Sequence, residues 1–209
     1  MSSNAFSVFS NQEPSMINER QFIESYQREI GDLVENITVT DVEGMDLDGL
    51  AEGIIRAKDY LSGLIGGTGK VMLIGNGASA SIASHMATDF WRNSRIRATE
   101  FNDSALLTCV SNDFCYEEVF SRPVEMFAEK GDVLICISSS GKSPNIIAAA
   151  DMARDKDCFV ITLTGFGEDN PLRRKGDINF YVPSPRYGPV ETLHTYVLHC
   201  INDLIIANR

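Results

Sequence analysis

The sequence lacks features that mark several common classes of protein. Its five cysteines include no C-x-x-C pair, and most have apolar neighbours, so we expect reduced core residues of a cytosolic protein. No stretch approaches the roughly 18 uninterrupted apolar residues of a membrane span. The first residues, MSSNAFSVFSNQEPS, show no basic start followed by an apolar block. We therefore expect a soluble cytoplasmic protein with no membrane partner.

Basic residues are also scarce. The chain has 18 Lys and Arg against 29 Asp and Glu, a net charge of -11, which repels phosphate backbones at long range. Nucleic acid is therefore not expected as a direct partner. The segment GNGAS lacks both the G-x-G-x-x-G spacing of dinucleotide sites and the G-K-[ST] of a P-loop, which argues against a nucleotide cofactor.

The chain is expected to consist of a short tail and one domain. Residues 1–14 are polar, and we expect them to form a flexible tail. Residues 15–209 are interpreted as a single domain, because a chain of 209 residues with 44% hydrophobic content suits one core. Its first part, residues 15–68, is predicted to be a helical extension, since apolar residues recur at helical spacing over 16–37 and again over 47–65.

Beyond Gly69, short apolar runs alternate with helical segments, and a last helix is predicted from Val190 to about Ala207. Such alternation is typical of a parallel sheet covered on both faces. We predict an α/β fold, a three-layer α-β-α sandwich with a five-stranded parallel sheet that the two N-terminal helices precede. The predicted strands are KVMLIG (70–75), RATEF (97–101), DVLICIS (132–138), CFVITLTG (158–165) and INFYV (178–182).

Glycine and serine follow two of these strands, in LIGNGASAS (73–81) and CISSSGKS (136–143). Ligands of such sheets bind beyond the carboxyl ends of the strands, where strand order reverses. Free amides at a helix start attract anions, and serine hydroxyls add donors. The alternative is that Ser143 only caps a helix and the other serines only form a polar turn. Capping needs fewer hydroxyls, so phosphate binding is favoured, by Ser138, Ser139, Ser140 and Ser143.

The three histidines fall in two short segments. His85 and Asp89 are four residues apart and share a helix face, while Glu191 and His199 project to broadly one side of the last helix. Each histidine alone, His194 included, is better explained by packing. Two pairs of an acid and an imidazole beside a phosphate site favour general acid and base chemistry. The same four groups could hold a metal, although their spacing matches no zinc signature.

Together these segments resemble the sugar isomerase (SIS) domain family, and within it the bacterial phosphoheptose isomerases. The likeness runs from about Lys70 to Leu204, through GNGAS, SHMATDF, VSNDFCYEEVFSR, GDVLICISSSGKSPNI, VITLTG and ETLHTYVLH. It implies a flavodoxin-like fold, a cytoplasmic homotetramer and a sugar phosphate substrate. The activity implied is aldose-ketose isomerisation of sedoheptulose 7-phosphate to a manno-heptose 7-phosphate through an enediolate. This step feeds nucleotide-activated heptose biosynthesis for lipopolysaccharide or capsule.

The resemblance also implies residue roles. The loop of residues 138–143, called the serine loop below, would hold the phosphate. The acid and base pair would be Asp89 and His199. Some relatives bind zinc at positions that correspond to His85, Asp89, Glu191 and His199. The residues expected to contact or orient the sugar are Asn76, Gly77, Ser79, Asp113 and Glu191.

Three positions depart from the family pattern. Asp89 replaces a glutamate, Glu191 replaces a glutamine, and Gly188 replaces an aspartate that contacts the sugar in the heptose enzymes. The aspartate draws its carboxylate back by about 1.5 Å, one carbon-carbon bond. The alternative function is therefore a non-catalytic SIS domain, either a sugar-phosphate-binding regulator or a scaffold of the replication-initiator-binding type.

Overall fold

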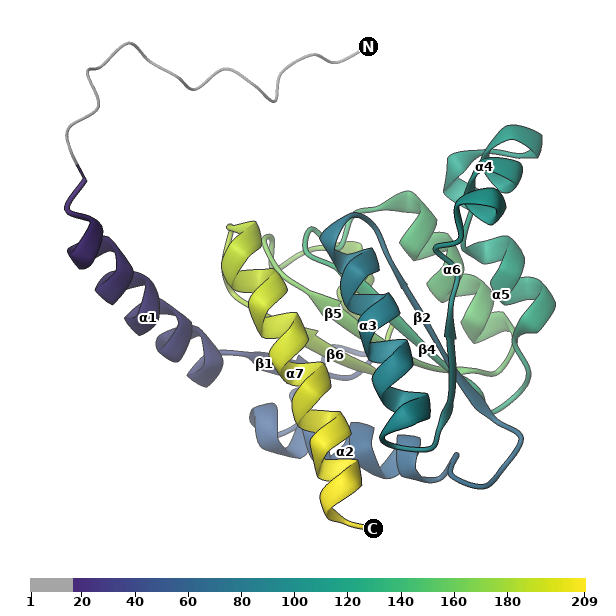
Figure 1. Ribbon diagram of the computed structural model, residues 1–209, viewed down its shortest axis with the longest axis horizontal. Coiled ribbons are helices and arrows are strands. Elements are labelled where there is room, and N and C mark those ends of the chain that lie inside the picture. The colour runs from purple at the N-terminus through teal and green to yellow at the C-terminus, as the bar shows by residue number, and fades with distance from the viewer. Residues whose placement is uncertain (1–16) are drawn as a thin grey trace.

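The computed structural model describes residues 17–209 (Figure 1), so the predicted tail, residues 1–14, lies outside the described residues. The strands are β1 (Thr38–Thr40), β2 (Lys70–Gly75), β3 (Arg97–Glu100), β4 (Val133–Ser138), β5 (Phe159–Thr164) and β6 (Ile178–Tyr181). The helices are α1 (Glu19–Glu35), α2 (Gly49–Ser62), α3 (Ala78–Arg92), α4 (Ser104–Asp113), α5 (Ser121–Phe127), α6 (Pro144–Asp155) and α7 (Tyr187–Ala207), with short 3-10 helices η1 (Tyr116–Glu118) and η2 (Pro171–Arg174).

The five predicted strands form a parallel sheet in the order β6-β5-β4-β2-β3. The chain moves from β2 outward to β3 and then returns to the other side of β2 to form β4. The strand order therefore reverses between β2 and β4, where the sequence predicts a ligand site.

Helices cover both faces of the sheet, as the three-layer prediction requires (Figure 1). Successive side chains of a strand point to opposite faces, so Leu73 packs with Phe90 of α3 under α2, α3 and α7, while Met72 packs with Phe120 beneath α5 and α6. All six residues of β4 are buried, as expected for a central strand covered on both sides.

The sheet has six strands rather than the five predicted. β1 pairs antiparallel with β6, with Val39 opposite Phe180, and it lies between α1 and α2. The expectation that both helices precede the first strand is therefore wrong. Three residues are too short a run to show an alternating pattern, and only the available edge of β6 gives them a partner.

α1 lies apart from the sheet, and in Figure 1 it extends to one side of the molecule. None of its 17 residues is buried, although Phe22 and Ile23 are large and apolar. Its contacts with the body include an ion pair between Glu29 and Arg186, just before α7. In residues 17–209 no helix has both the length and the hydropathy of a membrane crossing.

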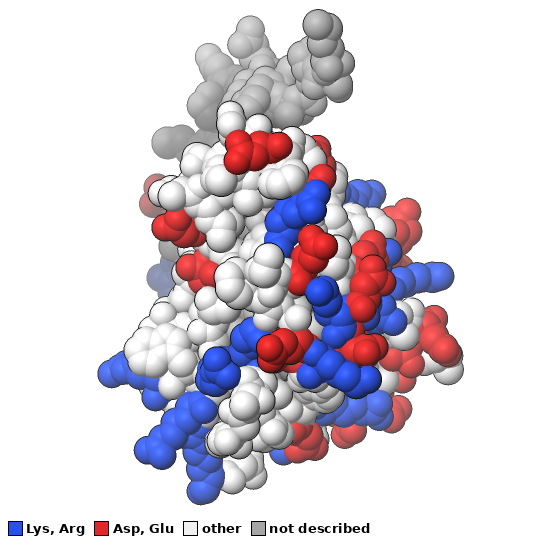
Figure 2. Space-filling view, turned by 90° about the vertical axis from the view of Figure 1, so that its right-hand side faces the viewer, with Lys and Arg blue, Asp and Glu red and all other residues white. Residues whose placement is uncertain are grey.

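The cysteines only partly match the expectation of core residues. All five are free, and Cys136 and Cys158 are buried, but Cys109 is exposed on α4, a helix with no buried residue. Toward the right of the view in Figure 2, Lys and Arg side chains lie among Asp and Glu side chains. Arg122, for example, pairs with Glu118 and Glu125.

One histidine belongs to the core. His194 is fully buried on α7, and its Nε2 lies 3.1 Å from the carbonyl oxygen of Thr164 in β5. Burial lowers the pKa of His194 from its ordinary 6.5 to about 4, because the charged imidazolium loses its hydration there. The neutral ring is therefore the native form at neutral pH, as the packing interpretation of a lone histidine predicts.

The buried ring makes stability depend on pH. Between pH 6.5 and about 4 the unfolded chain binds a proton that native His194 does not, so the free energy of unfolding falls as the pH falls. We expect the wild type to lose about 2 kcal/mol more than His194→Gln between pH 7 and pH 5, measured by urea unfolding. Thr192→Ala, at an exposed position of the same helix, changes no titrating group; it is the control and should keep the wild-type slope. Identical pH profiles of wild type and His194→Gln would contradict this prediction.

Candidate active site

A cleft of about 270 Å³ lies at the carboxyl ends of β2 and β4, between the first turns of α3, α6 and α7. It brings together two loops that are far apart in the sequence, as the strand pattern predicts. Seven of its lining residues are predicted ligand contacts, and Glu191 is an eighth. The lining comprises Asn76, Gly77, Ala78, Ser79, Ile137, Ser138, Ser139, Ser140, Ser143, Tyr187 and Glu191.

Glycine shapes the first loop. A Cβ added at Gly75 would lie 2.5 Å from the backbone carbonyl group of Ser79, so only glycine lets the strand end pass this closely over the helix start. Gly77 has φ +58°, where other L-residues are strained, and it immediately precedes α3. The backbone thus turns sharply from the strand into the helix, and the first amides of α3 border the cleft.

The serine loop offers hydroxyls that capping does not use. Ser143 occupies the N-cap position of α6, yet its side chain makes no hydrogen bond to the helix amides. Its Oγ instead lies 3.5 Å from Oγ of Ser138, which also accepts from the Gly141 amide at 3.2 Å. Oγ of Ser139 is buried and has no partner among residues 17–209. These observations disfavour the capping alternative.

Two side-chain amides join the loops across the sheet. Asn76 and Asn145 each donate from Nδ2 to Oδ1 of the other, at 3.0 and 2.9 Å. The Tyr116 hydroxyl donates to Oδ1 of Asn76 at 3.1 Å. Asn76 is thereby held by α6 and by η1, which fixes one wall of the cleft.

A second group of polar side chains lies on the outer faces of α3 and α7. Oδ2 of Asp89 lies 3.4 Å from Nε2 of His85 and 3.7 Å from Nδ1 of His199. Its Oδ1 accepts from Nδ2 of Asn93 at 3.2 Å, one helical turn away. The Asp89 side chain is 17% exposed, against 59% for His85 and 39% for His199. We call these three residues, His85, Asp89 and His199, the His-Asp triad.

The triad and the cleft occupy different parts of the same two helices. Ser79 and Asp89 are ten residues apart on α3, and Glu191 and His199 are eight apart on α7, which corresponds to about 15 Å and about 12 Å along the helix axes. Glu191 lines the cleft and does not join the triad. Asp113 is exposed at the end of α4, where it accepts from Asn112, and it is not part of the cleft lining.

Comparison with known proteins places this architecture. The family model described as SIS domain matches residues 25–165. The chain belongs to the SIS domain family. A phosphoheptose isomerase of Helicobacter hepaticus is 39% identical over 162 residues, 75% of this chain and 82% of that protein. One from Aromatoleum aromaticum is 34% identical over 165 residues, 75% and 83% of the two chains.

Solved structures agree with this assignment. The phosphoheptose isomerase of Neisseria gonorrhoeae superposes with a TM-score of 0.77 at 28% identity, covering 90% of this chain and 99% of that one. The Francisella tularensis enzyme gives 0.77 at 26% identity, covering 91% and 100%. The predicted flavodoxin-like SIS fold is confirmed, with the added edge strand β1.

The triad of this SIS domain has a donor set that suits zinc. Two imidazoles and one carboxylate offer ligand atoms that all lie within 4.8 Å of one another. Three protein ligands with an open fourth position are typical of catalytic zinc sites. Glu191, the fourth ligand suggested by the resemblance, is not among them within one chain.

Sequence reasoning did not single out several residues of the site. Tyr187 lines the cleft from the first turn of α7, Asn145 and Tyr116 hold Asn76, and Asn93 orients Asp89. Asn145 and Tyr187 each lie in the first turn of a helix at the carboxyl edge of the sheet, and that position was the available signal. Tyr116 contacts Asn76 only through the tertiary fold, and Asn93 is significant only because it lies one helical turn after Asp89.

The close approach at Gly75 gives a stability prediction. Gly75→Ala should lower the free energy of unfolding by about 2 kcal/mol, because the methyl group meets the Ser79 backbone, which must move. Gly31→Ala is the control: Gly31 lies inside α1 with no atom within 4 Å of an added Cβ, so alanine should leave stability unchanged or raise it. Urea unfolding of both variants checks this, and equal stabilities would contradict it.

Proposed function

We propose that this SIS domain is a cytoplasmic phosphoheptose isomerase that converts sedoheptulose 7-phosphate to a manno-heptose 7-phosphate in nucleotide-activated heptose biosynthesis. The observation that carries the proposal is the cleft, in which free hydroxyls and helix amides meet at the strand-order reversal. The similarity to phosphoheptose isomerases over three quarters of the chain supports the same activity.

The phosphate is held by the serine loop in this proposal. Hydroxyls of Ser138, Ser139, Ser140 and Ser143 donate to its oxygens, and so does the amide of Asn145 in the first turn of α6. Pro144 has no N–H, and the Ile146 amide already donates to Ser143. Glu191 lines the same cleft. A carboxylate there accepts hydrogen bonds from sugar hydroxyls and repels a phosphate placed beside it, so it helps to set the direction in which the sugar lies.

Proton transfer is assigned to Asp89 and His199. One removes a proton from C1 of the open-chain ketose, beside the C2 carbonyl, which gives an enediolate, and the other gives a proton to the C2 oxygen. Return of a proton to C2 and loss of one from the C1 oxygen completes the aldose. His85, Asp89 and His199 would together hold a zinc ion, which would supply Lewis acidity to polarise a carbonyl in place of proton transfer by Asp89 and His199.

A second copy of the chain is needed to bring these groups to one substrate. From C1 to phosphorus the substrate has six carbon-carbon bonds, one C–O bond and one O–P bond, which extend at most about 12 Å. This is no more than the separation of triad and cleft along α3 and α7. We therefore propose that the cleft of one chain faces the triad of another, in the homotetramer that the resemblance implies. The unburied apolar side chains of α1 are available to such an assembly.

Turnover tests the catalytic assignment. We expect purified protein to convert sedoheptulose 7-phosphate, assayed with added zinc and after chelation. Asp89→Asn and His199→Ala should each lose at least about a hundredfold in kcat while still binding substrate, because general acid-base groups contribute about this much. A wild-type rate in either variant would falsify the assignment. Wild-type protein that binds the sugar phosphate without converting it would favour the alternative function, a sugar-phosphate-binding regulator.

The serine loop has its own test. Ser138→Ala combined with Ser140→Ala should weaken sugar phosphate binding by about a hundredfold, since two hydrogen bonds to a charged group are lost. The melting temperature should change little, because the Gly141 amide keeps the Ser138 carbonyl oxygen as a partner and the Lys142 amide that Ser140 accepts from is exposed. Calorimetric titration and thermal melts measure the two quantities. Unchanged affinity in the double variant would reduce the loop to a structural turn.

A further inference from the structure

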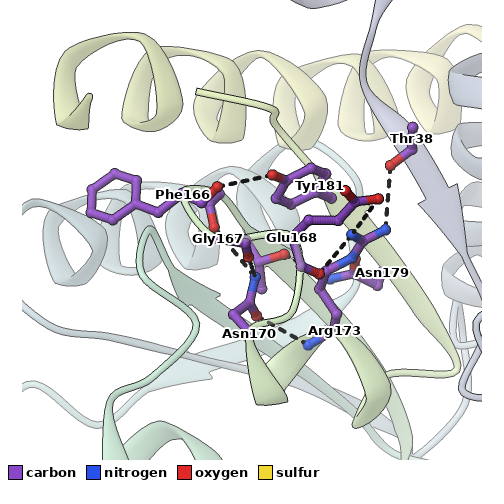
Figure 3. A network of polar contacts seen from close by, with 10 residues as sticks. Thr38, Phe166, Gly167, Glu168, Asn170, Arg173, Asn179 and Tyr181 are labelled. Carbon is purple, nitrogen blue, oxygen red and sulfur yellow. Dashed lines mark hydrogen bonds and ion pairs between the residues drawn. The ribbon is translucent and has the colours of Figure 1, made fainter. Parts of the chain in front are cut away.

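A buried asparagine lies behind the serine loop, on the side away from the cleft. Asn170 is 2% exposed and precedes η2 (Figure 3). Its Nδ2 donates to the carbonyl oxygens of Gly165 at 3.3 Å and Gly167 at 2.8 Å, and its Oδ1 accepts from the Arg173 amide at 3.3 Å. One side chain therefore ties both ends of the 165–173 segment together.

The same side chain packs directly on the serine loop. Gly141 has φ +61°, and a Cβ added there would lie 1.9 Å from Oδ1 of Asn170. The Gly141 carbonyl oxygen accepts from the Leu172 amide at 3.2 Å, in the segment that Asn170 organises. Gly141 thus packs against Asn170 on one side of the loop, while Ser140 and Ser143 line the cleft on the other.

Gly141 in turn positions a phosphate-binding hydroxyl. Its amide donates both to the carbonyl oxygen of Ser138 at 3.1 Å and to Oγ of Ser138 at 3.2 Å. The Ser138 hydroxyl is itself 3.5 Å from that of Ser143. A displacement of Gly141 therefore moves the donors of the proposed phosphate site.

Contacts of Arg173 and Tyr181 hold the segment that contains Asn170. The Arg173 guanidinium lies 4.2 Å from the centre of the Tyr181 ring, donates to the carbonyl oxygen of Glu168 at 2.9 Å and reaches Oγ1 of Thr38 at 3.4 Å (Figure 3). The Tyr181 hydroxyl donates to the carbonyl oxygen of Phe166 at 2.9 Å. These contacts fasten the 165–173 segment to β6 and to the edge strand β1.

We propose that Asn170 is a positioning residue for sugar phosphate binding, which acts by holding Gly141 and through it the Ser138 hydroxyl. The inference rests on the proposed function of the serine loop. Asn170 is absent from the cleft lining, so its effect reaches the ligand only through the loop. We assign Asn170 to binding that is equal in the ground state and the transition state, for which the effect falls on KM rather than on kcat.

Kinetics and binding of Asn170→Ala test the proposal. We expect KM for sedoheptulose 7-phosphate, and Kd for this sugar phosphate and for inorganic phosphate, to rise about tenfold, with kcat within about threefold of wild type. Asn202→Ala is the matched control, because Asn202 is 1% exposed and its Oδ1 accepts from Ser94 at 2.7 Å near the other end of α7. It should lower the melting temperature and leave KM unchanged.

A pair of variants at the contact keeps the test decisive even if Asn170→Ala folds poorly. Gly141→Ala should weaken phosphate binding, because the methyl group collides with Asn170. Gly141→Ala with Asn170→Gly removes the collision and should bind more tightly than Gly141→Ala alone. Wild-type KM and Kd in folded Asn170→Ala, or wild-type Kd in Gly141→Ala, would overturn the proposal. Wild-type protein that binds neither phosphate compound would instead refute the proposed function.

Discussion

Two neighbouring parallel strands, β2 and β4, end at the same edge of the sheet, and the pairing of Gly75 with Ile137 keeps the two ends level. That register places the GNGAS turn and the serine loop side by side, so that the first turns of α3 and α6 open into one cleft. The Asn76 and Asn145 amides then join the two loops. Every property proposed for the site depends on this adjacency, because neither loop alone surrounds a ligand.

The proposed anion site uses neutral donors inside an acidic protein. The chain carries a net charge of -11, and Glu191 is the one charged side chain among the described residues that line the cleft. Backbone amides at helix starts and serine hydroxyls attract a phosphate only at short range, and their strength depends on placement. This dependence explains why the backbone around the cleft is held closely in place. Gly75 permits the close approach of strand and helix, and Asn170 packs against Gly141 behind the serine loop.

The groups proposed for binding and for proton transfer occupy separate stretches of the same helices. α3 and α7 each begin at the cleft and carry a member of the acid and base pair two or three turns later. A helix is straight and stiff over this distance, so in our proposal the two groups reach one small substrate from different chains. The proposed catalytic function therefore depends on assembly, and Glu191 and the triad would meet only between chains.

The sequence by itself determined the layers, the parallel strands and the two loops that line the cleft, because hydrophobic periodicity and glycine-serine turns are local signals. It also identified His85 with Asp89, which share a helix face by spacing alone. It did not show β1, since Thr38–Thr40 becomes a strand only where β6 offers an edge. Tertiary structure alone decided that Asn170 contacts the Gly141 position and that Asp113 lies outside the cleft. It also decided that Glu191 lines the cleft while His199 belongs to the triad. These outcomes depend on the packing of distant segments, which no local pattern encodes.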